Sequence, residues 1–254
     1  MLHSSSVIYS SSLAGLYTSL MKLLLTSQSI HNKTIRRALL GLLDKPSQDC
    51  TVVYITTSQN AAVGDKSWLI ENLNNAYDVG WKSFEIIDIA AAIDLPKDMW
   101  WDRIAAADVI FVGGGANFYL GYWLEKSGFA AALPKLLEDK VYVGCSAGSM
   151  ITTKSLVTAS QSMKQLEAEG RFSLDGLGPE GQRSSRSLGI VNFAVRPHYA
   201  SSEYTYITDD LLQKAADVAG CTIYAIDDES ALKIVDGTVE VVTEGQYRFF
   251  DPVE

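Results

Sequence analysis

The sequence has few cysteines and no long hydrophobic run. Its three cysteines, Cys50, Cys145 and Cys221, are odd in number and widely spaced, and no Cys-x-x-Cys pair occurs. This pattern argues against a disulfide framework and a structural zinc site, and it is typical of a reducing, cytoplasmic compartment. The longest apolar runs, such as residues 109–112, have the length of a strand and not of a membrane span. We therefore expect a cytoplasmic protein with no membrane partner.

Clustered positive charge is also lacking. The chain has 21 Lys and Arg against 30 Asp and Glu, a formal net charge of −9. The nearest approach to a basic run is Arg183 and Arg186 among serines. Binding to nucleic acid needs clustered Lys and Arg that neutralise phosphates, so we expect no nucleic-acid partner.

The first 20 residues differ in composition from the rest of the chain. They are rich in serine and contain no Lys or Arg. A signal peptide has a positive start and an unbroken apolar core, and neither occurs here. We interpret residues 1–20 as an upstream extension without stable structure, and residues 21–254 as a single domain.

From residue 21 onwards, strand-like and helix-like segments alternate. Unbroken apolar, β-branched runs such as residues 51–56 are typical of strands buried on both faces of a parallel sheet. Near the C-terminus, Asp236-Gly237 predicts a hairpin between two short strands. The pattern predicts an α/β fold, a three-layer sandwich with a mainly parallel sheet and antiparallel strands near the C-terminus. The predicted strands are 23–26, 51–56, 83–89, 109–112, 141–144, 188–195, 222–226, 231–235, 239–243 and 247–250, and the predicted helices are 35–43, 68–79, 99–107, 118–137, 147–155 and 208–219.

Residues 156–187 break this alternation, and we interpret them as a long polar excursion of functional importance. In sheets of this type a ligand binds beyond the carboxyl ends of the strands. The segments that follow predicted strands at this rim are 27–31, 58–61, 113–117, 145–149, 196–199 and 227–230.

The strongest motif is Gly144-Cys145-Ser146-Ala147-Gly148, a G-x-S-x-G pattern between an apolar strand and a predicted helix. This context predicts a nucleophile elbow, a turn so sharp that Ser146 takes a strained backbone and presents its hydroxyl. The Ala147 amide would then be one donor of an oxyanion hole. A tight strand-to-helix turn with an N-capping serine is the alternative interpretation.

A nucleophilic serine needs a base, and histidine is the usual one. The chain has three: His3 in the N-terminal extension, His31 near the first strand-to-helix connection, and His198 at a predicted strand end. We expect His198 to be the base, because it lies at the same rim as Ser146. A hydrogen-bonded structural histidine is the alternative.

The third member of such a triad is a carboxylate that fixes the imidazole tautomer. The strand at 222–226 is followed by Asp227, Asp228 and Glu229, and any of these could face the rim. Asp175, which lies between the serine and the histidine in the sequence, is a further candidate. A solvated turn between two strands is the alternative for at least two of the three consecutive acids.

Residues 113–115 are three glycines between a predicted strand and a predicted helix. Such a loop can point free backbone amides into a cleft, so an amide of Gly114 or Gly115 is the expected second oxyanion donor. The spacing is not that of a dinucleotide-binding loop, and no Gly-Lys-Ser/Thr follows as in a P-loop. A flexible turn is the alternative.

Four segments occur in the order and spacing of a known family. GGGANF at 113–118, GCSAGS at 144–149, PHY at 197–199 and IDDESAL at 226–232 resemble the peptidase E family of serine peptidases, which includes the aspartyl dipeptidases and cyanophycinase. The resemblance covers the chain from about residue 21 to the C-terminus. It implies a class I glutamine-amidotransferase-like α/β fold with a serine in place of that fold's usual cysteine.

The resemblance also implies a function, the hydrolysis of short peptides without a metal or cofactor, and the aspartyl dipeptidases prefer an N-terminal aspartate. On the matching positions, Ser146 is the nucleophile and His198 the base, and the glycine loop with the Ala147 amide forms the oxyanion hole. Asp228 matches the acid of cyanophycinase-like members. Aspartyl dipeptidases place an Asp after the serine in a region that here, at residues 158–162, contains no acid.

Two departures from the family concern substrate binding. The glycine loop reads Gly-Ala-Asn where family members often have Gly-Asn-Thr, which shifts the expected polar contact to Asn117. An aspartate-binding site needs a cation near the serine, and Arg196 is the expected substrate-binding residue. The other candidates for this role are Arg171, Arg183 and Arg186.

Other functions stay open. The chain could be a non-catalytic member of the family that binds a small acidic ligand, or an esterase or amidase. A glutaminase that uses Cys145 is disfavoured, because Cys145 points away from the cleft if Ser146 points into it. No sustained heptad occurs, and we expect a monomer or a homodimer.

Overall fold

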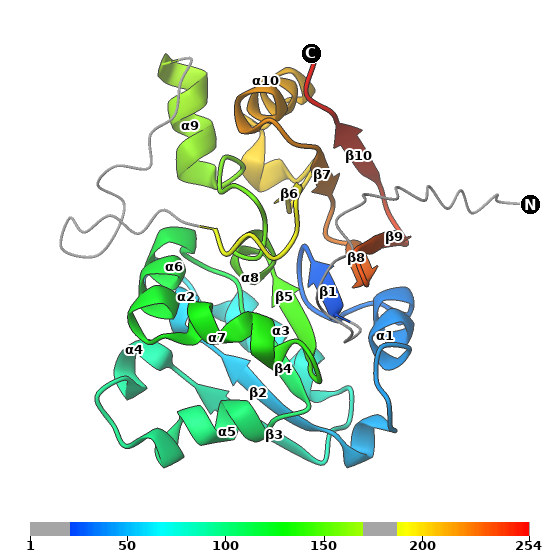
Figure 1. The fold of residues 1–254 in the computed structure, drawn as a ribbon. Coiled ribbons are helices and arrows are strands. Elements are labelled where there is room, and N and C mark those ends of the chain that lie inside the picture. Colours follow the sequence, from blue (N-terminus) through cyan, green and yellow to red (C-terminus); the bar gives the residue numbers. More distant parts are fainter. Residues whose placement is uncertain (1–20, 170–186, 254) are drawn as a thin grey trace, which may run out of the picture.

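The computed structural model describes residues 21–169 and 187–253, and a seven-stranded sheet forms the centre of this part of the chain (Figure 1). Its strand order is β3-β2-β4-β5-β1-β8-β9. Neighbouring strands from β3 to β1 are parallel, whereas β8 and β9 are antiparallel to their neighbours. The strands are β1 (Lys22–Thr26), β2 (Thr51–Ile55), β3 (Ser83–Ile87), β4 (Val109–Val112), β5 (Val141–Cys145), β8 (Ser230–Val235) and β9 (Thr238–Thr243).

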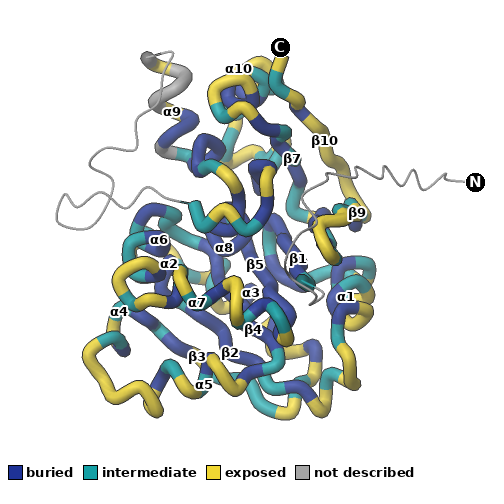
Figure 2. Tube along the Cα trace, viewed as in Figure 1, coloured by how far each residue is buried: buried dark blue, intermediate teal, exposed yellow. Residues whose placement is uncertain are grey.

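Helices cover both faces of this sheet, because successive side chains of each buried strand point to opposite sides. Along β1, Leu23 and Leu25 join one hydrophobic cluster and Leu24 joins another. Helices α1 (Lys33–Leu40) and α3 (Ser67–Tyr77) pack on the Leu24 side. The Leu23 side is covered by α4 (Ile89–Ala92), α5 (Trp101–Ala106), α6 (Asn117–Lys126), α7 (Phe129–Leu136) and α8 (Ala147–Met150). The fold is therefore the expected three-layer α/β sandwich, and Figure 2 shows the buried strands between partly exposed helices.

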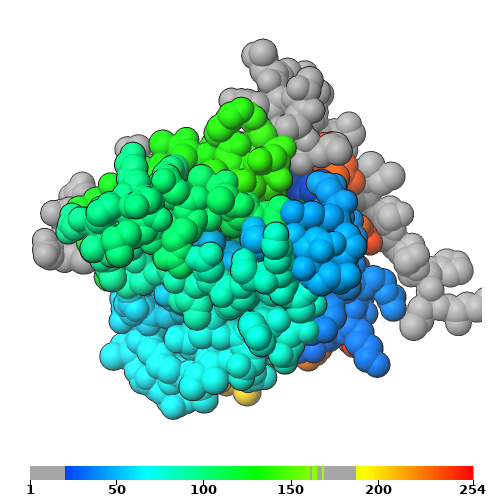
Figure 3. Space-filling view, turned by 90° about the horizontal axis from the view of Figure 1, so that it is seen from below, coloured from blue at the N-terminus to red at the C-terminus, as the bar shows by residue number. Residues whose placement is uncertain are grey.

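A second, three-stranded sheet lies beside the first, with the order β10-β7-β6. It contains β6 (Ala194–Arg196), β7 (Ile223–Ile226) and β10 (Tyr247–Phe250). This sheet packs with α9 (Ser160–Glu169) and α10 (Asp209–Ala219) around a third hydrophobic cluster. Helix α8 contacts both β5 and β6, so the carboxyl end of the central sheet faces the second sheet (Figure 1). The view from below shows a face built mainly by the first half of the chain (Figure 3).

The short elements are α2 (Thr57–Asn60) and the 3₁₀ helices η1 (Ser47–Asp49), η2 (Lys97–Met99) and η4 (Ser202–Tyr204). One turn prediction is confirmed, and one predicted helix is divided. The helical stretch at 118–137 forms two helices separated at Gly128, which has a φ of 81°. The β8–β9 hairpin turns at Asp236 and Gly237, with φ of 48° and 75°, as a type I′ turn requires.

The expected strand at 188–195 is wrong over most of its length, because β6 has only three residues. Backbone amides of residues 188–191 instead donate to carbonyls of residues 151–153, just after α8. The predicted helix at 147–155 is correspondingly short and ends at Met150. The hydroxyls of Thr152 and Thr153 donate to the carbonyls of Ser149 and Met150, and this local bonding competes with further helix.

The interpretation of 156–187 as a polar excursion is wrong for residues 160–169, which form α9. This helix has few apolar residues, so the sequence gives little sign that one side of it is buried. Met163 on that side is fully buried in the third cluster. Residues 170–186 lie outside the described residues, as do residues 1–20, on which the predicted extension falls. No helix within 21–169 or 187–253 combines the length and apolar character that crossing a membrane requires.

Candidate active site

Ser146 stands in a sharp turn between β5 and α8. Its backbone φ is 48° and its ψ is −105°, a combination that costs free energy in any residue other than glycine. The flanking glycines permit this turn. A Cβ on Gly144 would lie 2.6 Å from backbone atoms of Gly148 and Ser149, and a Cβ on Gly148 would lie 2.0 Å from the Val112 carbonyl oxygen. The turn projects the Ser146 side chain at the carboxyl edge of the sheet.

The structure brings Ser146, His198 and Asp228 together at this edge. His198 Nε2 lies 3.0 Å from Ser146 Oγ, and His198 Nδ1 lies 2.6 Å from Asp228 Oδ1. His198 follows β6 and Asp228 follows β7, so the second sheet supplies both side chains to the serine of the central sheet. In this arrangement one imidazole nitrogen can accept the serine proton while the other donates to the carboxylate.

Asp228 is held in its ionised form. Burial by itself would raise the pKa of Asp228, but hydrogen bonds from His198 and Ser27 and the charge of His198 outweigh it and lower the pKa. The neighbouring acids have other partners. Asp227 accepts hydrogen bonds from Ser230 Oγ at 2.5 Å and from the Gln246 amide at 2.6 Å. Glu229 lies 3.1 Å from His31 Nε2. Glu229 and Asp227 therefore contact other residues near the turn, and Asp228 is the acid that faces His198.

Ser27, the residue after β1, connects the acid and the base. Its hydroxyl donates to Asp228 Oδ1 at 2.7 Å and accepts a hydrogen bond from the His198 backbone amide at 2.7 Å. Ser27 is fully buried.

An aromatic ring packs on the imidazole from another direction. Tyr204 in η4 stacks on His198, and the guanidinium carbon of Arg196 lies 4.8 Å from the centroid of the same tyrosine ring. The His198 backbone has a φ of 58°, so the histidine itself is held in an uncommon conformation.

The glycine loop lies against the serine. A Cβ on Gly114 would lie 3.2 Å from Ser146 Cβ, and Gly115 has a φ of 133° with Ser58 O only 2.4 Å from where its Cβ would be. The Ser58 hydroxyl also donates to the Gly114 carbonyl at 2.6 Å, which fixes the loop. Ala147 is the first residue of α8, so its amide has no acceptor within the helix.

Of the two expected substrate-binding residues, Asn117 begins α6 two residues after the last glycine of the loop. Its Oδ1 is buried and has no hydrogen-bond partner within the described part of the chain. Arg196 is 1% exposed, and its Nη1 donates to the Thr158 carbonyl at 2.9 Å. Its Nε and Nη2 have no hydrogen-bond partner in residues 21–169 and 187–253, and burial lowers its pKa. Such a guanidinium suits an anionic group.

Four other candidates, Arg171, Asp175, Arg183 and Arg186, lie outside the described residues. Among the residues that the structure describes, no group of three or more His, Cys, Asp or Glu side chains could hold a metal ion.

Cys145 points away from Ser146. Its side chain joins the cluster on the α1 and α3 side of the sheet, and its Sγ lies 3.7 Å from Asn72 Nδ2. Burial raises the pKa of this thiol to about 12, although the nearby Thr26 hydroxyl and Gly114 amide oppose the rise. The thiol is therefore protonated and is a poor nucleophile.

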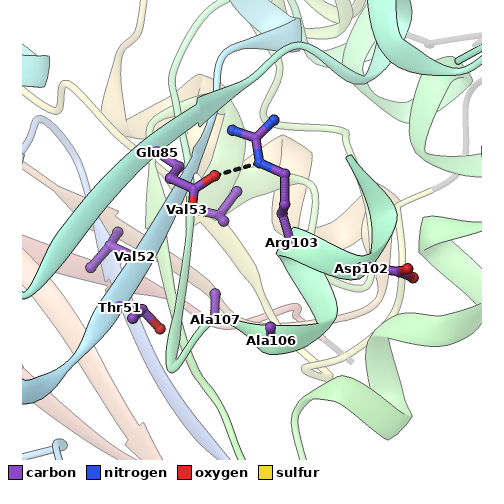
Figure 4. Close-up of a pocket in the computed structure, with 8 residues that line it drawn as sticks. All are labelled: Thr51, Val52, Val53, Glu85, Asp102, Arg103, Ala106 and Ala107. Atoms are coloured by element: carbon purple, nitrogen blue, oxygen red, sulfur yellow. Dashed lines mark hydrogen bonds and ion pairs between the residues drawn. The ribbon is translucent and has the colours of Figure 1, made fainter. Parts of the chain in front are cut away.

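A separate hollow of about 290 Å³ lies between α5 and strands β2 and β3 (Figure 4). Arg103 and Glu85 point toward each other there and form an ion pair. None of the rim side chains line this hollow, so we place the candidate site at the serine and not here.

Two residues of the site were not singled out from the sequence. Ser27 lies in segment 27–31, so the strand-end rule marks its position but nothing in the sequence marks this serine over its neighbours. Tyr204 lies in a short 3₁₀ helix that no periodicity predicts.

Known proteins match most of the chain. Residues 23–242 match peptidase family S51. The chain is 23% identical over 194 residues to an uncharacterised peptidase of Pasteurella multocida. The matched region covers 75% of this chain and 84% of that protein. It is 27% identical over 203 residues to an uncharacterised peptidase of Listeria innocua, covering 78% and 85% of the two chains. A shorter match to peptidase E of Streptomyces coelicolor is 34% identical over 98 residues, 38% of this chain and 34% of that one.

Solved structures share the fold. A peptidase E protein from Listeria monocytogenes superposes with a TM-score of 0.68 at 20% identity, covering 89% of this chain and 100% of that chain. A peptidase from an acI-B1 actinobacterium gives a TM-score of 0.64 at 18% identity, covering 92% of each chain.

Proposed function

Because this chain belongs to peptidase family S51, we propose that it is a serine peptidase that hydrolyses short peptides, with a preference for an N-terminal aspartate. The observation that carries the proposal is the alignment of three side chains. The 3.0 Å contact from Ser146 Oγ to His198 Nε2 and the 2.6 Å contact from His198 Nδ1 to Asp228 have the geometry of a nucleophile, a base and an orienting acid.

In the proposed reaction, His198 removes the proton from Ser146 as the serine oxygen attacks the scissile carbonyl. Asp228 keeps the Nδ1 proton in place, so Nε2 is the nitrogen that accepts. The tetrahedral intermediate collapses when His198 gives its proton to the leaving amine. The acyl-enzyme on Ser146 is then hydrolysed by a water that His198 activates.

Backbone amides stabilise the developing oxyanion. The Ala147 amide is one donor, because it is free of the α8 hydrogen-bond pattern. The glycine loop supplies the other. Both glycine amides stay candidates, and a Cβ position on Gly114 only 3.2 Å from Ser146 Cβ shows how closely the loop approaches the serine.

Arg196 and Asn117 are the proposed substrate-binding residues. A buried guanidinium without a carboxylate is costly, and a substrate carboxylate that reaches Nε and Nη2 would offset that cost. This supports a preference for an acidic residue next to the scissile bond. Asn117 is proposed to contact the substrate backbone from the start of α6.

The setting of the enzyme is part of the proposal. We place the reaction in the cytoplasm, where the three free cysteines stay reduced. We propose that residues 21–254 act as one domain, as a monomer or a homodimer, without a nucleic-acid partner.

The test is hydrolysis of a dipeptide panel that includes Asp-X, with a chelator present, by wild type, Ser146→Ala and Ser149→Ala. Ser149 is a matched control, because it lies in α8 three residues after Ser146 and its hydroxyl donates to the Thr26 carbonyl. Wild type and Ser149→Ala should cleave peptides and react with a fluorophosphonate, and Ser146→Ala should do neither. A wild type that neither cleaves a peptide nor reacts with the fluorophosphonate would overturn the proposal. Ester analogues of the same dipeptides are assayed alongside, and turnover of the esters without cleavage of the peptides would indicate an esterase.

A further inference from the structure

We infer that Ser27 is a positioning residue of this site, whose buried hydroxyl holds both the acid and the base of the triad in register with Ser146. The inference rests on the proposed function, since it assigns Ser27 a part in that reaction. In the part of the chain that the structure describes, the Ser27 hydroxyl bonds to Asp228 and to His198, so its action passes through these two residues.

The hydroxyl of Ser27 is used in both directions. It donates to Asp228 Oδ1 at 2.7 Å and accepts from the His198 backbone amide at 2.7 Å, and it lies 3.4 Å from His198 Nδ1. A serine hydroxyl has one proton to donate and two lone pairs. Its single donor is therefore committed to the carboxylate, and its acceptor capacity serves the histidine.

The backbone that carries this hydroxyl is itself held firmly by the sheet. Ser27 directly follows β1, which lies inside the sheet between β5 and β8, and its backbone amide donates to the Ser230 carbonyl on β8 at 3.3 Å. It is fully buried, so water does not compete for these hydrogen bonds. A fixed point on the central sheet is thereby joined to two side chains that come from the second sheet.

His198 needs such a restraint. Its φ of 58° is a conformation that non-glycine residues hold only when the surroundings enforce it. The hydrogen bond from its amide to Ser27 Oγ acts on this residue, and the next amide, of Tyr199, donates to the Ile226 carbonyl at 3.0 Å. These two bonds fix where the imidazole leaves the backbone.

Asp228 needs a restraint for a different reason. Its side chain is 37% exposed, so water could draw the carboxylate away from the imidazole. Its Oδ1 accepts from both Ser27 Oγ and His198 Nδ1. The hydrogen bond from Ser27 therefore holds this oxygen at the place where the imidazole proton must point.

The test compares Ser27→Ala with Ser29→Ala. Ser29 is the matched control, because it is a fully buried serine two residues along whose hydroxyl donates to the Asn72 carbonyl and not to the triad. We expect Ser27→Ala to lower kcat roughly tenfold with KM unchanged, the effect of losing one hydrogen bond to a charged group. Ser29→Ala should keep the wild-type kcat. A wild-type kcat in Ser27→Ala, or an effect on KM alone, would overturn the inference.

A double-mutant cycle separates positioning from loss of stability. If Ser27 acts through Asp228, then Ser27→Ala should cost roughly tenfold in wild type but less than about threefold in the Asp228→Asn background. If Ser27→Ala only destabilised the protein, it would lower kcat by the same factor in wild type and in Asp228→Asn. Equal factors in the two backgrounds would therefore overturn the inference.

A measurement without substrate keeps this inference distinct from the proposed function. The proton on His198 Nδ1 should give a strongly deshielded proton NMR resonance, assigned by its loss in His198→Ala. Ser27→Ala should shift or broaden that resonance, and Ser29→Ala should leave it in place. If wild type cleaves no peptide, the proposed function fails while this result still tests the positioning. If the enzyme is active and the resonance is the same in Ser27→Ala, only the inference about Ser27 fails.

Discussion

The ring of Tyr204 stacks on the imidazole of His198, with ring centroids 5.4 Å apart and ring planes 16° apart. The two residues lie in one short connection, since η4 begins four residues after the histidine. Hydrogen bonds at Nδ1 and Nε2 fix two points of the imidazole in its plane, and the stacked ring opposes tilting out of that plane. Tyr204 therefore completes the restraint on the base.

This stack predicts that the aromatic ring of Tyr204 matters and that its hydroxyl does not. Tyr204→Phe should keep kcat, whereas Tyr204→Leu should lower it by roughly two- to tenfold, since aromatic pairs contribute about 0.5–1.5 kcal/mol beyond their burial. Steady-state kinetics on the best dipeptide measures both. Tyr77→Leu is the control, because Tyr77 is exposed on α3. Equal losses in the Phe and Leu variants would contradict the prediction.

Substitution of Asp228 and substitution of Asp227 are predicted to have very different effects on kcat. Asp228→Asn should lower kcat by roughly 10³- to 10⁴-fold, because an amide does not hold the imidazole in the required tautomer. Asp227→Asn should leave kcat nearly intact but lower the free energy of unfolding by about 1–3 kcal/mol, since Asp227 accepts from Ser230 and Gln246 in the turn. Kinetics and urea unfolding of the two variants measure these effects. A large loss of kcat in Asp227→Asn would reassign the acid.

The sequence predicts those parts of the fold that depend on residues close together in the chain. The unbroken apolar run at 51–56 gives a buried strand because nothing polar interrupts it, and Asp236-Gly237 turns because both positions need a positive φ. The G-x-S-x-G spacing was informative for a similar reason. At Gly144 and Gly148 a Cβ would collide with the backbone, so the glycines report the turn directly.

The remainder depends on tertiary contacts that no local pattern carries. Residues 188–191 have strand-like composition, yet their amides bond to the carbonyls that follow α8, so the strand shortens to β6. The three consecutive acids after β7 are equivalent in local pattern, and only the family resemblance favours Asp228 from the sequence. In the structure, the contacts of each side chain distinguish Asp228 from Asp227 and Glu229. A serine at a strand end is common, so the position of Ser27 between two triad members could not be anticipated.

The cysteines are predicted to resist alkylation in the folded protein. Cys50, Cys145 and Cys221 are all buried, and burial raises the pKa of each thiol, that of Cys145 to about 12. Since the thiolate is the reactive form, iodoacetamide near pH 8 should add nothing to the native chain and should not inhibit it. In urea all three cysteines should react, and mass spectrometry counts the adducts. An adduct on native Cys145 would show that the turn at Ser146 opens.

Asp108 is predicted to contribute stability that disappears in acid. Its carboxylate accepts from the Thr51 amide at 2.7 Å and lies 2.8 Å from Lys45 Nζ. Burial by itself would raise the pKa of Asp108, but hydrogen bonds from Lys45 and Thr51 outweigh it and lower the pKa. A carboxyl with a lowered folded pKa stabilises the fold above its unfolded pKa, about 3.9, and loses that contribution as the pH falls through the folded value. Asp108→Asn should therefore lower the urea midpoint near pH 7, and its difference from wild type should shrink as the pH falls below the unfolded pKa of about 3.9. The kcat at neutral pH should be unchanged, because Asp108 precedes β4 at the end of the sheet away from Ser146. A difference in midpoint that is the same at every pH from neutral to strongly acidic would mean that the ionised form of Asp108 adds no stability to the folded protein.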